Sequence, residues 1–242
     1  CSFELMNPNA GDAHYLQGHI PGAVRADLDR HLSAAKGTPD VASGGRHPLP
    51  AREVFATWLG SVGLRPDMQA VVYDHQGCNY CGRMWWMLKW VGHEAVAVLD
   101  GGLPAWKAMG ESVESGTGAT SNPTNYSLAQ ECVRLADTKY IASHLGQPVQ
   151  TLIDARGAPR FRGEVEPLDP VAGHIPGALN RPFTENFDAQ GKFKPAAQLR
   201  SEFQALLAGR DPSTVVHHCG SGVTAVPNII AMEVAELGRS TL

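Results

Sequence analysis

A six-residue motif occurs twice in this chain of 242 residues. Gly18 to Ala23 read GHIPGA, and Gly173 to Ala178 read the same letters. A short β-branched run follows each copy and leads into a loop that contains glycine: Val71-Val72 after the first and Val215-Val216 after the second. Identical motifs followed by the same kind of segment indicate an internal repeat. We therefore predict two copies of one structural unit, which constrains the fold more than any other feature.

Strand and helix patterns alternate within each copy, which predicts an α/β fold with a parallel sheet flanked by helices on both faces. Apolar residues at helical spacing, with prolines near helix starts, predict the helices, and β-branched runs predict the strands. The predicted helices span 50–62, 82–91, 104–109 and 195–207, and one begins at about 223; the predicted strands span 70–73, 95–99, 151–153 and 214–217.

The boundary between the copies is predicted from composition. Residues 111–125 are rich in Ser, Gly, Thr and Pro, which are linker residues. We predict a first domain at 1–115, a linker at 116–125 and a second domain at 126–242. The strand before the second GHIPGA has no counterpart after Cys1, and the strand at 95–99 has none before Leu242. We therefore expect the full protein to have a further strand at each end.

Composition excludes several classes of function. The formal net charge is −4 and basic clusters are absent, which argues against binding to nucleic acid. No apolar stretch approaches the ~20 residues of a membrane helix, and no signal-peptide pattern occurs. The five cysteines are too few and odd in number for a disulfide framework, which favours a reducing compartment. We expect a soluble cytoplasmic protein with no membrane partner.

Residues 215–225, VVHHCGSGVTA, place Cys219 directly after a predicted strand. Loops at the carboxyl ends of parallel strands form the ligand crevice of such sheets. Gly220 and Gly222 allow the backbone amides to turn toward the sulfur, and the following helix favours negative charge at its start. These features predict a nucleophilic thiolate. The alternative is a buried cysteine that only fills a tight turn, but the first copy's loop at 75–83 has different residues, so shared packing does not require this sequence.

A cysteine phosphatase is a rival interpretation of the same loop. Such enzymes clamp the phosphate with an arginine six residues after the cysteine, and that position is Ala225 here. Without this cation a phosphate ester would be poorly held, so we reject this interpretation.

Cys78 and Cys81 form a CxxC pair in the first copy's loop. A structural zinc site needs two further ligands, and none is spaced nearby, so we predict no metal. A redox dithiol is the alternative. His217 and His218 also resemble a ligand pair, but successive strand residues point to opposite faces of a sheet.

Several motifs together resemble the tandem rhodanese-type sulfurtransferases, over nearly the whole chain. They are the two GHIPGA copies, the CGSGVTA loop, Asp154-Ala155-Arg156, Arg160 to Gly163, and Asp100 to Leu103. The resemblance implies two tandem rhodanese-like domains, the first degenerate and the second catalytic. It also implies sulfur transfer from a small-molecule donor, through a persulfide on Cys219, to cyanide or a reduced thiol such as thioredoxin. No cofactor is implied.

The loop is most similar to that of the 3-mercaptopyruvate sulfurtransferases, because Gly220 and Ser221 stand where thiosulfate enzymes carry basic residues. This resemblance implies that Cys219 attacks the donor sulfur, that Ser221 and His19 form an acid/base relay, and that Arg160 binds the donor carboxylate. Asp12 is the candidate partner of His19. The other implied donor-binding residues lie in the loop: Gly220, Gly222, Val223 and Thr224.

Three points stay open in the sequence. The subgroup usually has a second donor-binding arginine after Arg160, and residues 163–170 contain none, so thiosulfate is an alternative donor. A noncatalytic persulfide carrier is an alternative function, although Ser221, Arg160 and His19 would be surplus to it. For His174, the duplicate of His19, we favour a structural role as the cap of a turn.

Overall fold

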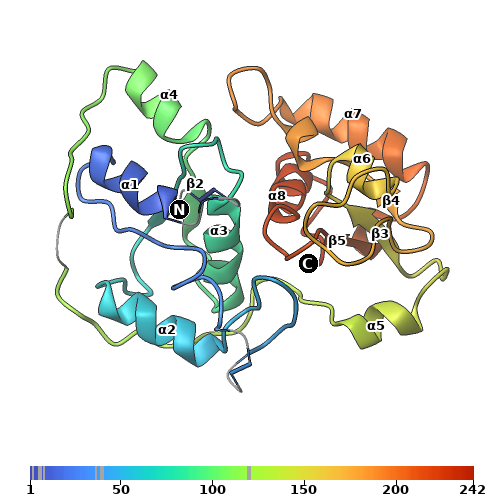
Figure 1. Ribbon diagram of the computed structural model, residues 1–242, viewed down its shortest axis with the longest axis horizontal. Helices are drawn as coiled ribbons and strands as arrows, with labels where there is room; N and C mark the ends of the chain where they lie inside the picture. Colours follow the sequence, from blue (N-terminus) through green and yellow to red (C-terminus); the bar gives the residue numbers. More distant parts are fainter. Residues whose placement is uncertain (2, 5–6, 8, 36, 39–40, 119–120) are drawn as a thin grey trace. The chain divides into compact units, whose positions relative to one another are not determined.

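The computed structural model describes residues 1–242 except residues 2, 5–6, 8, 36, 39–40 and 119–120. The chain divides into two compact units (Figure 1). The first contains residues 1–132 and 190–192, and the second contains residues 133–189 and 193–242.

The first unit is organised around a two-stranded parallel sheet, in which Ala70 pairs with Val96 and Val72 with Val98. Every residue of the helix α3 is buried, and this helix packs against both strands. An apolar helix over short parallel strands is the arrangement that the alternating pattern predicts. The elements of this unit are α1 (Ala10–Gln17), α2 (Arg52–Ser61), β1 (Ala70–Val72), α3 (Cys81–Trp90), β2 (Val96–Val98) and α4 (Gly102–Ala108).

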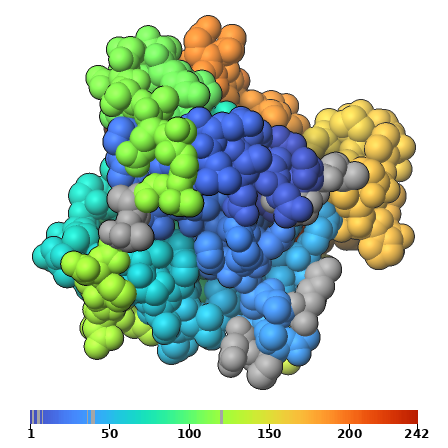
Figure 2. All heavy atoms as spheres, turned by 60° about the vertical axis from the view of Figure 1, so that its left-hand side comes forward, coloured from blue at the N-terminus to red at the C-terminus, as the bar shows by residue number. Residues whose placement is uncertain are grey.

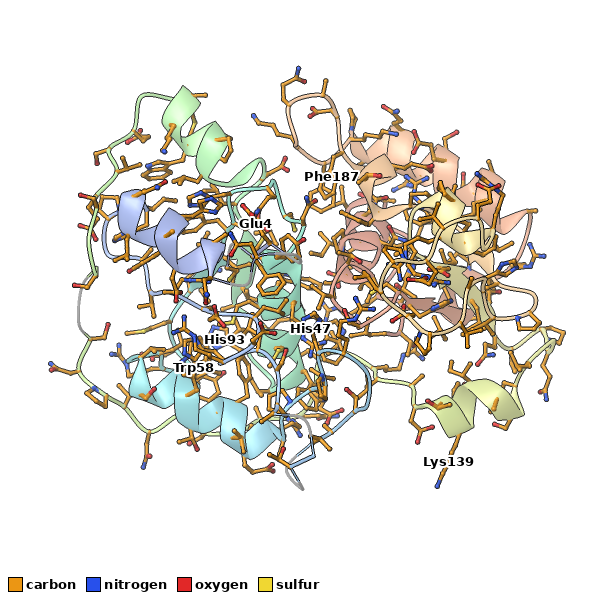
Figure 3. The ribbon with its side chains drawn as sticks, in the orientation of Figure 1. Glu4, His47, Trp58, His93, Lys139 and Phe187 are labelled. Carbon is orange, nitrogen blue, oxygen red and sulfur yellow. The ribbon has the colours of Figure 1, made fainter. Side chains whose placement is uncertain are left out.

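The helices α1 and α2 lie at the surface of the first unit, where α1 and the coil after it are drawn in blue (Figure 2). Trp58 extends from α2, and its ring stacks on His31 at a centroid distance of 4.9 Å (Figure 3). The coil before the second unit packs on α2, because the Thr124 amide donates to the Gly60 carbonyl at 2.8 Å. A Cβ atom at position 60 would overlap the Thr124 carbonyl oxygen, so this close approach requires glycine.

The second unit contains a three-stranded parallel sheet in the order β4-β3-β5. On one face Ile153 and Val215 pack with Leu199, Phe203 and Met232, which come from the helices α7 and α8. Its elements are α5 (Thr138–Ser143), β3 (Thr151–Asp154), α6 (Ala158–Phe161), β4 (Leu179–Asn180), α7 (Ala196–Leu207), β5 (Val215–His218) and α8 (Val226–Val234), with 3-10 turns at Phe183–Asn186 and Pro212–Thr214.

The opposite face of this sheet is covered by the short helices α5 and α6. Leu152 and Val216 pack there against Ile141 of α5 and Phe161 of α6. Lys139, on the outer side of α5, points away from the unit (Figure 3). The second unit is thus a parallel sheet with helices on both faces, as the sequence predicted.

The helices and strands predicted within 1–242 are all present, and their ends differ from the prediction by at most three residues. The largest difference is at α8, which begins at Val226 and not at about 223, because residues 219–225 form the turns of the cysteine loop. The periodicity did not predict α1, α5, α6 or β4, which are short or weakly amphipathic. The strands expected before Cys1 and after Leu242 stay predictions.

No helix among the described residues is long and apolar enough to cross a membrane.

Candidate active site

Cys219 is a free, partly buried cysteine at the carboxyl end of β5. The Ser221 amide donates a hydrogen bond to its sulfur at 3.5 Å. Gly222 has a φ of 69°, a left-handed conformation that suits glycine, and this lets the loop curl back around the sulfur. Gly220 is not among the glycines with a positive φ. The prediction that the loop backbone needs glycine therefore holds only for Gly222. Val223 is buried, and Thr224 is partly exposed.

In the first unit a loop also follows β1, and Asp74 lies near its start. The Asp74 side chain is fully buried, and its carboxylate accepts hydrogen bonds from four backbone amides. The Gln76 amide, two residues on, donates at 2.8 Å, just as the Ser221 amide two residues on donates to Cys219. Successive amides of this kind form a site for an anion. In the first unit the chain's own carboxylate occupies it.

A cavity of about 340 Å³ opens beside Cys219 within the second unit. Its polar lining comes from Arg156, Asp169, His174, His218 and Cys219, and its apolar lining includes Val171, Ala172 and Ile175. The cation is Arg156, which follows β3, and the carboxylate is Asp169, which lies between α6 and the second GHIPGA motif. The cavity therefore places the thiol among groups of both charges.

Arg160, the predicted donor-binding residue, is held by two carboxylates. It donates to Glu166 Oε1 at 2.7 Å and to Asp169 Oδ2 at 2.9 Å. The hydrogen bonds from Arg160 lower the pKa of Glu166 from 4.5 to about 2. Arg160 is not among the described residues that line the cavity, whereas its partner Asp169 is. To bind a donor carboxylate, Arg160 would have to exchange one of these partners.

Arg156 is the guanidinium that does line the cavity. It contacts the buried carboxylate of Asp154 at 2.7 Å and Glu166 at 3.3 Å, and it donates to the Gly173 carbonyl at 2.6 Å. These contacts tie β3, the segment after α6 and the second GHIPGA motif together. Arg156 was predicted only as part of the Asp154-Ala155-Arg156 motif, and no local pattern pointed to Asp169.

The two histidines before Cys219 point to opposite sides of β5, as the strand period requires. His217 is buried in the core, with Nε2 3.1 Å from Met232 Sδ, and burial lowers its pKa to about 3. His218 lines the cavity. Burial lowers the pKa of His218 as well, against the opposing charge of Asp154.

The two GHIPGA histidines have different environments. His19 is fully buried in the first unit, with Nδ1 2.8 Å from the Tyr15 carbonyl and Nε2 3.1 Å from Glu114 Oε1. His174 is exposed at the cavity, with Nδ1 2.7 Å from the Phe161 carbonyl and its ring stacked on that of Phe161 at 3.7 Å.

The structure does not bring Asp12 to the ring nitrogens of His19. Asp12 forms ion pairs with Arg25 at 3.1 Å and with Arg30 at 2.6 Å. The carboxylate that meets His19 is that of Glu114, which also accepts a hydrogen bond from the Gly22 amide. Because Glu114 lies 95 residues after His19, local spacing gave no signal for this contact.

Cys78 and Cys81 are buried, free thiols. Burial, with a hydrogen bond from Cys78 as the next cause, raises the pKa of Cys81 well above its usual value. A thiol that stays protonated and inaccessible is a poor nucleophile. Among the described residues no cluster of three His, Cys, Asp or Glu side chains could hold a metal ion.

Both halves of the chain match a known family. Residues 8–109 and residues 137–239 each match the family described as Rhodanese-like domain. The chain belongs to the rhodanese-like domain family.

Relatives match the rhodanese-like chain over most of its length. A Pseudomonas aeruginosa protein named "Probable 3-mercaptopyruvate sulfurtransferase" is 46% identical over 238 residues, covering 97% of this chain and 82% of the relative. "Thiosulfate/3-mercaptopyruvate sulfurtransferase 2" of Arabidopsis thaliana is 32% identical over 250 residues, covering 94% and 70%. The crystal structure of SseA from Escherichia coli, described as a 3-mercaptopyruvate sulfotransferase with the rhodanese fold, has a TM-score of 0.79 and 32% identity, covering 95% and 83%.

These matches confirm the sequence-based assignment to tandem rhodanese-like domains and to an α/β fold. They do not test the individual site residues. The roles of Cys219, Ser221, His19, Asp12 and Arg160 therefore stay predictions.

Proposed function

We propose that this chain is a sulfurtransferase that takes a sulfane sulfur onto Cys219 as a persulfide and passes it to a thiophilic acceptor. The observation that carries the proposal is the Ser221 amide directed at the Cys219 sulfur. In the first unit the Gln76 amide makes a similar contact with the carboxylate of Asp74, two residues before it. A loop backbone of this form stabilises a thiolate and, one sulfur longer, a persulfide anion.

The transfer balances without a cofactor. The Cys219 thiolate attacks the sulfur of 3-mercaptopyruvate, the carbon–sulfur bond breaks, and its electron pair stays on the carbon. The proton of the donor thiol ends on that carbon, which gives pyruvate and the Cys219 persulfide. Cyanide then takes the outer sulfur, which gives thiocyanate and restores the thiolate. Two half-reactions through a covalent intermediate give ping-pong kinetics.

The charges in the cavity favour 3-mercaptopyruvate as the donor over thiosulfate. Arg156, the guanidinium in the lining, already contacts Asp154 and Glu166, and Asp169 adds a carboxylate to the same lining. A dianion such as thiosulfate would meet more repulsion there than a monoanionic keto acid. The names of the relatives include both donors, so thiosulfate is the second candidate.

Other parts of the assignment stay predictions. Arg160 binds the donor carboxylate in this proposal, with Asp169 released from their 2.9 Å contact. Gly220, Gly222, Val223 and Thr224 form the rest of the donor-binding loop, and Ser221 is a candidate for the acid/base relay. His19 and Asp12 also stay predictions for that relay, although the structure does not pair them. Reduced thioredoxin as the acceptor and the cytoplasm as the location also stay predictions.

The test is a steady-state comparison of 3-mercaptopyruvate and thiosulfate, with cyanide as acceptor and thiocyanate as the measured product. We expect multiple turnovers with wild type, a higher kcat/KM for 3-mercaptopyruvate, and no turnover for Cys219→Ser. The matched control is Cys132→Ser, which removes a partly exposed cysteine of the first unit and should leave the rate unchanged.

Each competing interpretation has its own outcome. Persulfide formation without multiple turnover would indicate a noncatalytic carrier. A large preference for thiosulfate would overturn the charge argument, and full activity of Cys219→Ser would overturn the proposal itself.

A further inference from the structure

We propose that His174 is the base that takes the donor's thiol proton and returns it to the leaving carbon. This inference rests on the proposed function, and it assigns the proton-transfer step to a residue in the same unit as Cys219. It departs from the structural role that the duplicated motif indicated for His174.

A backbone carbonyl fixes the tautomer of the His174 ring. Its Nδ1 lies 2.7 Å from the Phe161 carbonyl oxygen. A carbonyl oxygen only accepts hydrogen bonds, so Nδ1 carries the proton and Nε2 of the neutral ring has a free lone pair. Stacking on Phe161, with ring centroids 3.7 Å apart and planes 15° apart, fixes the orientation of the ring. A histidine held in one tautomer by a carbonyl is the arrangement of a general base.

His174 lies at the cavity beside Cys219. His174 is exposed and lines the same cavity as Cys219, so a donor whose sulfur reaches Cys219 also enters the space beside His174. The backbone just before it is anchored, because Arg156 donates to the Gly173 carbonyl at 2.6 Å. The other titratable groups that face this space are Arg156, Asp169, His218 and Cys219.

His19, which occupies the same position in the first GHIPGA motif, has different surroundings from His174. Both ring nitrogens of His19 face oxygen atoms, of Tyr15 and Glu114, and its side chain is fully buried. Both of its ring nitrogens therefore already have partners within the first unit. The same motif thus contains a buried histidine in the first unit, with contacts at both ring nitrogens, and an exposed histidine in the second, held through Nδ1.

The proton balance defines what His174 does. Nε2 accepts the proton from the donor thiol as the Cys219 thiolate attacks the donor sulfur. As the carbon–sulfur bond breaks, Nε2 returns that proton to the carbon that keeps the electron pair, and pyruvate leaves. The imidazole ends in its starting state. Cyanide attack on the persulfide moves no proton, so that half-reaction does not need His174.

The test compares His174→Asn with wild type in separate half-reactions. The asparagine NH₂ group can still donate to the Phe161 carbonyl, so the variant keeps the anchor and removes the base. We expect the single-turnover rate of persulfide formation from 3-mercaptopyruvate to fall about 10²-fold. Cyanide discharge of a persulfide loaded from inorganic polysulfide, which carries no proton to the site, should stay at the wild-type rate. Added imidazole should restore much of the lost rate.

The matched control is His144→Asn in the same unit. His144 Nδ1 also contacts a carbonyl, that of Tyr140 at 2.8 Å, and its ring packs on Tyr140 at 4.3 Å. It is not among the described residues that line the cavity, so this variant should react at the wild-type rate with 3-mercaptopyruvate.

The outcomes separate this inference from the proposed function. If wild type forms no persulfide from 3-mercaptopyruvate, the proposed function fails. If wild type forms it and His174→Asn forms it equally fast, His174 is not the base. If His174→Asn is slow in the cyanide step too, or imidazole restores nothing, the histidine supports the loop's structure and the inference is overturned.

Discussion

Substitution of Asp74 by Asn tests whether the first unit's loop is built around a buried anion. The two carboxylate oxygens each accept two amides: Oδ1 from Gln76 and Cys78, and Oδ2 from Tyr80 and Cys81. Asparagine keeps one oxygen and places an NH₂ group where the other was, so two buried amides lose their acceptor. At about 1–3 kcal/mol for each unsatisfied buried donor, the free energy of unfolding should fall by about 2–6 kcal/mol.

The assay is equilibrium urea denaturation of both proteins, followed by circular dichroism and fitted with a common m-value. Asp211→Asn is the control, because the exposed Asp211 caps a short turn through the Ser213 amide and asparagine serves equally well there. Persulfide formation on Cys219 should continue in Asp74→Asn below its unfolding transition. A loss below about 0.5 kcal/mol for Asp74→Asn would refute the reasoning, because the charge would then contribute no more than a surface group.

Three further predictions concern the second unit. The Glu166 carboxylate, whose pKa is about 2, stabilises the fold above pH 4.5, and this stability is lost as the pH falls from about 4.5 toward 2. Glu166→Gln should reduce that slope in denaturation midpoints measured against pH, while Glu202, whose pKa is also about 2, keeps its own part of the slope. Gly222→Ala should cost about 1–2 kcal/mol and slow persulfide formation, whereas Gly220→Ala lacks this backbone strain. Ala208 follows the last residue of α7 with a φ of 49°, a conformation that favours glycine. Ala208→Gly should therefore raise the free energy of unfolding, measured by urea denaturation, by about 0.5–1 kcal/mol.

The repeat and the hydrophobic periodicity were sufficient to predict the fold. Apolar residues at a period of 3.6 in 195–207 and β-branched runs at 70–73 and 214–217 have long enough patterns to predict their elements. The helix α1 could not be predicted in this way, since only Ala10 and Gly11 of its residues are buried and it has almost no apolar stripe. Such helices depend on tertiary contacts that a local pattern does not contain.

The candidate site was predictable in part. Cys219 and its loop follow from the strand, the glycines and the repeat, because all of these are local. The carboxylates that contact Arg160 and His19 could not be predicted in this way, because Asp169 and Glu114 reach these partners only in the folded chain. The sequence likewise could not distinguish His174 from His19, since both lie in identical motifs and differ in what covers them.

The central claim is that the second unit's loop carries sulfur on Cys219. The most direct measurement is mass spectrometry of proteolytic peptides after the protein has reacted with 3-mercaptopyruvate without an acceptor. We predict one added sulfur atom on the peptide that contains Cys219, removed by cyanide, with Cys78 and Cys81 unmodified. An unmodified Cys219 peptide, or sulfur on the Cys78 and Cys81 peptide in its place, would contradict the account.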